Sequence, residues 1–207
     1  MEAAHNIPPT PPSSNRSNPG GINIQQITER ATLLLTDPAA GWKVVAAEQR
    51  QDMEIFTQYV APLAGAAAAV QVVTSTFAGV GFFSSLTLGL VTFAFGALTL
   101  FVASFLLQKL APKFNATVTP QNAFRLPAFA GTASWVSGLV AFIPWIGALI
   151  GIAGSLYTVY LWFVGFNQLV TVPAENKWPL IGALVLSLIA FGMVSAFVLA
   201  PFIGAAV

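Results

Sequence analysis

Cysteine is absent from this chain of 207 residues, and the single histidine, His5, lies close to the N-terminus. The first absence excludes disulfides, cysteine-ligated zinc, iron–sulfur clusters and thiol chemistry. The second leaves no histidine for a metal site or a catalytic base in the rest of the chain. The sequence therefore predicts no metal site, no cofactor and no catalytic residues.

Charge is also scarce, because only 7% of the residues are Asp, Glu, Lys or Arg and the net charge is +1. Soluble domains carry roughly 25% charged residues. A chain with so little charge has too few polar side chains to cover a water-exposed surface. A balance so close to neutral also offers no electrostatic basis for binding nucleic acid, which we exclude from the expected partners.

What the chain does have is three long stretches without any charged residue, and their lengths are 54, 49 and 30 residues. They run from Ile55 to Gln108, from Leu126 to Ala174 and from Trp178 to Val207. One helical span needs roughly 20 apolar residues to cross the hydrocarbon core. The first two stretches hold two spans each and the last holds one. The sequence predicts an all-α, polytopic membrane protein with five transmembrane helices in one bundle.

We place these spans in a transmembrane domain of residues 55–207, at about 58–77, 85–107, 127–143, 146–166 and 180–200. As one straight helix the 49-residue stretch would be about 73 Å long, so it has to turn back. Pro144 and Trp145 mark the expected turn, since proline interrupts a helix and tryptophan suits the membrane interface. Trp178, at the start of the last span, is a predicted interface residue for the same reason.

The part before the first span divides into two segments. Residues 1–21 are rich in proline and serine and are expected to form a disordered cytoplasmic tail. A PxxP pattern within the tail is either a docking motif or an ordinary feature of a solvated segment. Residues 22–54 are expected to form short amphipathic helices that lie on the membrane surface.

Helical spacing supports the amphipathic interpretation, since Leu34 and Leu35 continue an apolar pattern that begins at Ile24. Asp37 followed by Pro38 predicts that a second helix begins there, with aspartate as its N-cap. Trp42 in this second helix is suited to the headgroup level. We therefore predict that Leu34, Leu35 and Trp42 contact the membrane interface. The alternative is that both helices pack on loops of the protein itself.

The positions of the basic residues predict an orientation. With five spans, all eight Lys and Arg residues fall on one side of the membrane and none on the other. The positive-inside rule assigns that side to the cytoplasm. We therefore expect a cytoplasmic N-terminus and a periplasmic or extracellular C-terminus.

The predicted spans hold no acidic residue and no histidine, which disfavours proton-coupled transport and leaves serine and threonine hydroxyls without a base to activate them. No enzymatic activity is predicted. Gly147, Gly151 and Gly154 form a stripe of small residues, suited to close packing either within the monomer or between copies in a homo-oligomer. Tyr157 and Tyr160 share one helix face and either pack as aromatic rings or line a polar path.

Three segments resemble the Yip domain family, the Ypt/Rab-interacting membrane proteins, and specifically its bacterial branch. The segment from Arg30 to Glu48 combines a short helix, a proline, a tryptophan and an acidic end. The second segment is Tyr59-Val60-Ala61-Pro62-Leu63. The third begins with Ile143-Pro144-Trp145 and continues through Gly154 to Gly165, with Val172-Pro173 and Lys177 behind it. The resemblance covers about residues 24–200.

The resemblance implies a small helical bundle in the bacterial cytoplasmic (inner) membrane. Eukaryotic members are associated with membrane trafficking and small prenylated GTPases, a role that does not carry over residue by residue. We therefore expect a non-enzymatic multi-pass protein that organises the membrane or recruits partners through its N-terminal segment. Its expected partners are membrane lipids, further copies of itself, or an unidentified membrane or cytoplasmic protein. The alternative is a passive channel or permease for a neutral or lipid-like solute.

Overall fold

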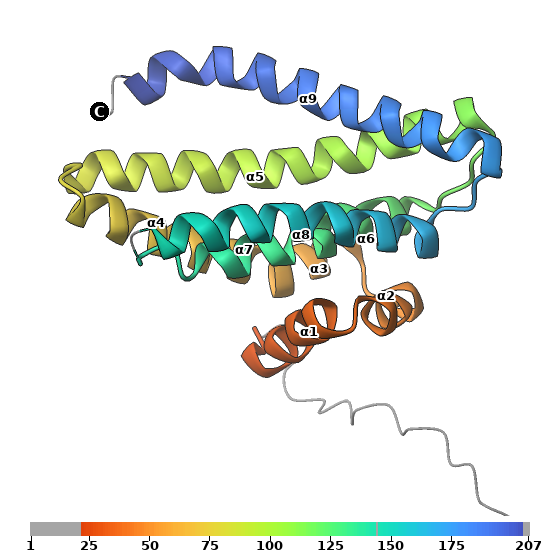
Figure 1. Ribbon diagram of the computed structural model, residues 1–207, viewed down its shortest axis with the longest axis horizontal. Coiled ribbons are helices and arrows are strands. Elements are labelled where there is room, and N and C mark those ends of the chain that lie inside the picture. Colours follow the sequence, from red (N-terminus) through yellow and green to blue (C-terminus); the bar gives the residue numbers. More distant parts are fainter. Residues whose placement is uncertain (1–21, 144, 205–207) are drawn as a thin grey trace, which may run out of the picture.

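The computed structural model describes residues 22–143 and 145–204, with side chains as far as Phe197, and the regular elements of this part are all helical (Figure 1). The α-helices are α1 (Ile24–Thr36), α2 (Pro38–Ala47), α3 (Asp52–Ile55), α4 (Ala61–Phe77), α5 (Phe82–Leu110), α6 (Pro120–Ala130), α7 (Thr132–Gly138), α8 (Ile146–Leu169) and α9 (Ala174–Gly204). A π-helical turn, η1 (Phe56–Val60), precedes α4, and a 3-10 turn, η2 (Ala111–Phe114), follows α5. The predicted disordered tail, with its PxxP pattern, lies outside the described residues.

Four helical segments are long and apolar enough to cross a membrane. They are Asp52–Phe77, Phe82–Phe114, Ile146–Leu169 and Ala174–Phe197. Their outward faces expose large apolar side chains such as Phe83, Leu149 and Leu186. A soluble monomer rarely exposes contiguous apolar surface on this scale, whereas lipid covers it readily. The chain is therefore an all-helical, multi-pass membrane protein.

The third predicted span is not a continuous helix. In place of a helix at about 127–143, the chain forms α6, then α7, and then turns over residues 139–143. Pro127 lies inside α6 and removes one backbone hydrogen bond, and Gly131 separates the two helices. The indole of Trp135 folds back over Gly131, where a Cβ atom would meet the ring. Five continuous spans are therefore not confirmed, and two short helices stand where the third was expected.

This broken segment nevertheless leads from one end of the bundle to the other. Thr117, before α6, pairs with Thr171, after α8, through two backbone N–H···O=C bonds of 2.8 and 3.0 Å. Because α8 has 24 residues, its first residue lies about 36 Å from that bridge. The chain between Thr117 and Ile146 therefore has to travel the length of α8, and α6 and α7 provide that path (Figure 1).

The core of the protein surrounds α6, whose residues 123–130 are all buried. This helix packs against α5, α8 and α3, and α7 continues the contact with α8 and also touches α4. In contrast, α9 lies beyond α5 and packs against α5 and η2 (Figure 1). The bundle is therefore dense around α6 and loosely packed at α9.

The first span begins with a wider helical turn that suits a proline. In η1 the N–H of Ala61 bonds to the carbonyl of Phe56, five residues back. Pro62 follows directly, and proline has no N–H and a ring that crowds the carbonyl four residues before it. The π-helical turn relieves this crowding and directs Tyr59 into the bundle, where its hydroxyl lies 2.8 Å from that of Thr132.

Helices α1 and α2 form an N-terminal arm that lies along the flank of the bundle (Figure 1). Asn23 caps α1 by accepting a bond from the N–H of Gln26 at 3.2 Å. Asp37 caps α2 by accepting a bond from the N–H of Ala40 at 3.0 Å, and Pro38 is the first helical residue. This confirms the helix start predicted from Asp37 and Pro38. The arm packs chiefly on α8, and it also touches α6 and α7.

Candidate functional site

Two of the three arm residues that we predicted to contact the membrane lie inside the protein. Leu34 and Trp42 are both 0% exposed, and both belong to the main hydrophobic core. No lipid can reach either side chain in this arrangement, because the bundle and the arm itself cover them. This corrects the expectation that these two side chains contact the membrane interface, because they pack inside the protein. Leu35 is half-buried and packs against the same core.

Helix α8 holds the arm at two places. The ring of Trp42 lies so close to Gly165 that a Cβ atom at that position would collide with the indole. Glycine is the residue that allows a ring to approach a helix this closely. Eight residues earlier on α8, the hydroxyl of Tyr157 donates a 2.8 Å hydrogen bond to the carbonyl of Leu35. That carbonyl lies in the last turn of α1, where carbonyls lack partners within the helix.

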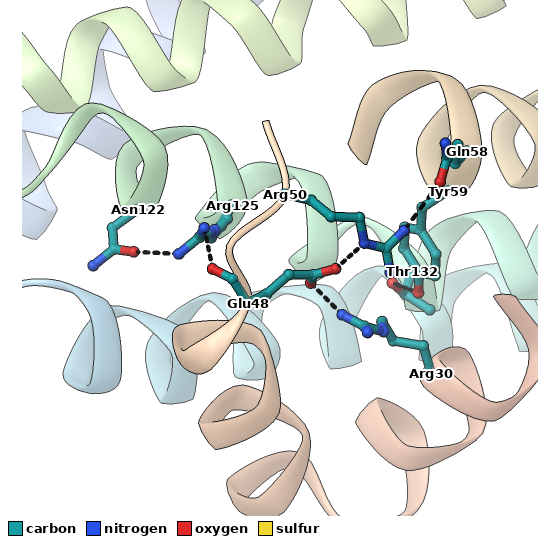
Figure 2. A network of polar contacts seen from close by, with 8 residues as sticks. All are labelled: Arg30, Glu48, Arg50, Gln58, Tyr59, Asn122, Arg125 and Thr132. Carbon is teal, nitrogen blue, oxygen red and sulfur yellow. Dashed lines mark hydrogen bonds and ion pairs between the residues drawn. The ribbon is translucent and has the colours of Figure 1, made fainter. Parts of the chain in front are cut away.

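Between the arm and the bundle, the carboxylate of Glu48 lies at the centre of a polar network (Figure 2). It forms ion pairs with Arg30 on α1 and with Arg50 in the link to α3. Only 6% of the Glu48 side-chain surface is exposed, so this carboxylate is largely shielded from water. Arg50 also donates to the side-chain oxygen of Gln58 at 3.5 Å. The network therefore connects α1, the end of α2 and the start of the first span.

Arg125, on the buried helix α6, joins this network (Figure 2). Its guanidinium donates to the backbone carbonyl of Glu48, and to the side-chain oxygen of Asn122 at 3.2 Å. Asn122 in turn donates to the carbonyl of Leu169, at the end of α8, at 3.3 Å. Arg125 is buried, and a buried charge requires such partners to offset its desolvation. The arm, α6 and α8 are thus tied together by polar contacts at one end of the bundle.

The other two predicted interface residues are both exposed. Trp145 precedes α8 and is 87% exposed, and Trp178 lies in the first turns of α9 and is 65% exposed. Trp178 stacks on Phe163 of α8, with 5.8 Å between the ring centroids. The start of α8 and the start of α9 lie at opposite ends of the bundle, so the two indoles lie at opposite ends as well.

The predicted glycine stripe on α8 has two kinds of surroundings. A Cβ atom at Gly154 would collide with Ser137 of α7, and one at Gly147 would press on the backbone of Ala141. These two glycines therefore serve packing within the chain. Gly151 has nothing within 4 Å of its added Cβ, so its surface remains open.

Sequence reasoning missed the Glu48 network. It gave Glu48 no role beyond the acidic end of the segment from Arg30 to Glu48, and it identified no partner for Arg125. One signal was present, because an arginine directly before 49 uncharged residues is costly next to the hydrocarbon unless it has partners. The identity of those partners depends on how the arm folds back, which helical periodicity does not reveal.

The Glu48 network consists largely of charged side chains that hold one another in place. Guanidinium and carboxylate groups bind oppositely charged groups through charge-assisted hydrogen bonds. Within residues 22–143 and 145–204, no three His, Asp or Glu side chains are grouped so that they would hold a metal ion. The site is a set of ion pairs and hydrogen bonds that connect the N-terminal arm to the bundle.

Comparison with known proteins gives one match. The family model described as "Yip1 domain" matches residues 32–196, which include most of the arm, the apolar helices and the Glu48 network except Arg30. No curated protein matches the chain, and no solved structure matches it.

Proposed function

The chain belongs to the Yip1 domain family, and on that premise we propose that it is a non-enzymatic, multi-pass protein of the bacterial inner membrane whose arm recruits partners and organises the membrane around it. The observation that carries this proposal is the docking of the arm. Trp42, Tyr157 and Glu48 hold the arm against the bundle, so its outer face is presented in a defined orientation.

The outer face of the arm suits an aqueous partner. On α1 most exposed side chains are polar: Gln25, Gln26, Thr28, Glu29 and Thr32, with Ile24 exposed at its first residue. On α2, Lys43 is exposed beside the apolar Val44 and three alanines. A helix that inserted into lipid would direct a broad apolar face outwards. On α1 the apolar residues Ala31 and Leu34 are turned towards the protein and the outer face is mostly polar, which supports recruitment from the water phase by this helix.

We also propose that the chain crosses the membrane five times, with a cytoplasmic N-terminus and its C-terminus on the opposite side. The four long helices account for four crossings, and α6 with α7 supplies the fifth. These two helices extend over 19 residues, about 28 Å along a helical path, which is close to the thickness of the hydrocarbon core. The positive-inside rule then supports the orientation, because Lys109, Arg125 and Lys177 follow or precede crossings on the arm side.

The absence of cysteine makes the orientation directly testable. Two variants each carry one cysteine: Lys43→Cys on the arm, and Val80→Cys between α4 and α5. These two positions lie at opposite ends of the bundle. With a membrane-impermeant maleimide on intact cells, we expect labelling at position 80 and none at position 43 until the cells are opened. Labelling of both positions in intact cells contradicts the proposed topology.

The recruiting role is testable by photo-crosslinking in cells. A photo-reactive residue at Gln26, on the outer face of the arm, is compared with one at Leu186, which is exposed on α9. We expect a discrete crosslinked protein from position 26 that is absent from position 186. Identical products from both positions argue against recruitment by the arm.

The alternative of a passive channel or permease has less support from the polar side chains within the bundle. Ser134 and Thr158 pair with each other at 2.7 Å, and Tyr59 pairs with Thr132 at 2.8 Å. Hydroxyls that bond to one another across helices contribute to packing and are not free to line a solute path. Flux of a neutral solute into proteoliposomes above the rate of empty vesicles is the result that favours the alternative.

A further inference from the structure

The Glu48 network holds more positive than negative charge. Three guanidinium groups, from Arg30, Arg50 and Arg125, meet in it, and we refer to them as the arginine cluster. Two carboxylates oppose them: Glu48 at the centre, and Asp52, which lies close enough to Arg125 to interact with it electrostatically. Three positive charges against two negative charges leave an excess of one. A largely enclosed excess charge favours the binding of an anion.

The arginine cluster also has more donors than its neighbours use. Each guanidinium carries five N–H groups in a fixed planar arrangement. Arg30 places one nitrogen on Glu48, whereas Arg125 uses both terminal nitrogens on Asn122 and on the Glu48 carbonyl. In the part of the chain that the structure describes, the Nε of Arg125 is buried without a hydrogen-bond partner, and so is the acceptor Oδ1 of Asp52. The N–H groups that a further oxygen-rich anion can reach are those of Arg30 and Arg50, whose side chains are partly exposed.

An anion can reach this cluster from the membrane surface. The side chains of Arg30 and Arg50 keep 20% and 23% of their surface exposed. The network lies towards the end of the bundle where α5 ends and α9 begins, which is also where Lys109 and Lys177 are found. Basic pockets beside transmembrane helices on the cytoplasmic side are typical binding sites for anionic headgroups.

We propose that the arginine cluster binds the phosphate group of an anionic lipid headgroup, and that the Glu48 carboxylate competes for the same guanidinium donors. Arginine forks match the tetrahedral oxygens of a phosphate in paired hydrogen bonds, as they match a carboxylate. A lipid supplies this phosphate at the level of the cluster, and its acyl chains lie along the exposed apolar helices. This site goes beyond partner recruitment and does not depend on it.

The first test measures which lipids stay bound to the purified full chain. The protein is equilibrated in detergent with equal amounts of phosphatidylglycerol and phosphatidylcholine, and retained lipids are counted by native mass spectrometry. We expect preferential retention of phosphatidylglycerol by the wild-type chain. Equal retention of the two lipids overturns the proposal.

Two variants of the cluster have opposite expected effects. Arg50→Gln removes a partly exposed guanidinium and should abolish the preference for phosphatidylglycerol. Glu48→Gln removes the competing carboxylate, keeps the shape of the side chain, and should raise phosphatidylglycerol retention above that of the wild type. A Glu48→Gln variant that retains less of this lipid, with its fold intact by circular dichroism, contradicts the proposed competition.

The matched control is Lys113→Gln, which removes one exposed positive charge in η2, outside the cluster. We expect this variant to keep the preference, and a loss equal to that of Arg50→Gln overturns a specific site in favour of general surface charge. Adding millimolar inorganic phosphate separates the two possible sources of the anion. Unchanged lipid retention supports the headgroup, whereas displacement of the lipid assigns the site to free phosphate.

Discussion

The two flanks of the bundle are held by different kinds of contact. On one flank, the arm is tied to α6 and α8 through Glu48, a fully buried tryptophan and a tyrosine hydroxyl. On the other flank, α9 rests on α5 through apolar contacts such as the stacked rings of Phe95 and Phe191, whose centroids are 5.8 Å apart. From Trp178 onwards the chain has no charged residue.

This difference reflects the solvent that each flank meets. Helix α9 leaves its apolar surface to lipid, and lipid does not drive two apolar helices together as water does. Helix α1 of the arm has a mostly polar outer face and an apolar inner face. On the proposed placement of the arm in water, docking on the bundle removes that apolar face from water. Specific docking by large side chains and charges is therefore expected at the arm, and tolerance of substitution is expected at α9.

The largest effect is expected from Trp42→Ala, which empties the space of a fully buried indole between α2 and α8. By comparison with other buried tryptophans, the loss in unfolding free energy is about 3–5 kcal/mol. Thermal unfolding in mild detergent measures the stability, and protease cleavage in the link at residues 48–51 reports release of the arm. Trp178→Ala is the control on the α9 flank, and an equal loss there would remove the distinction between the flanks.

A smaller effect is expected from Arg125→Gln, which takes away a buried donor to the Glu48 carbonyl and to Asn122. Leaving buried polar groups without partners costs about 1–3 kcal/mol. Lys177→Gln removes a charge at the start of α9 whose ammonium lies 5.0 Å from the ring centroid of Phe163. That exposed contact is worth about 0.5–1 kcal/mol. Denaturant titration of both variants compares them, and a larger loss at Lys177 would contradict the expectation.

Substitution of glycine by alanine should lower the stability of the protein on the arm flank and raise it on the α9 flank. Gly165→Ala drives a methyl group into the indole of Trp42, and overpacking of this kind costs about 1–3 kcal/mol. Gly192→Ala on α9 meets open space, so the better helix propensity of alanine should stabilise the helix by about 0.5–1 kcal/mol. Melting temperatures in the same detergent should fall for Gly165→Ala and rise for Gly192→Ala. Shifts in the same direction for both variants would contradict the difference between the flanks.

Among the substitutions that loosen the arm, the smallest effect is expected from Tyr157→Phe, which removes a single hydroxyl. The lost hydrogen bond to the Leu35 carbonyl contributes about 0.5–1.5 kcal/mol. Hydrogen exchange in the last turn of α1 should increase, because that turn loses its cap. Tyr160→Phe is the control, since Tyr160 is half-exposed and packs beside Tyr157 with 5.4 Å between the ring centroids. If the last turn of α1 were equally protected from hydrogen exchange in both variants, the Tyr157 hydroxyl would not hold the arm.

Some features were predictable because their causes are local in the sequence. Asp37 and Pro38 start α2 through a side-chain cap and a fixed backbone angle, and both effects act within a few residues. The position of Trp42 was not predictable, because an amphipathic ring suits a membrane interface and a protein interior equally well. Periodicity identifies the apolar face of α1 and leaves open whether lipid or protein covers it.

The same limit applies to the third span. Leu126 to Ala174 is as free of charge as the other stretches, so composition alone predicts two uniform helices there. Only the packing of Trp135 over Gly131 and of α6 among its neighbours explains why the first half is broken and buried. A broken helix at this depth is stable where protein surrounds it.

By itself, the sequence determined that this protein is helical and lies in a membrane, because long uncharged stretches satisfy their backbone only as helices in lipid. The resemblance to one family was also readable from three apolar motifs. Only the tertiary structure decided that the arm docks on the bundle and that Arg30, Glu48, Arg50 and Arg125 meet. Those contacts join residues up to 77 positions apart, and such distances are set by packing and not by local pattern.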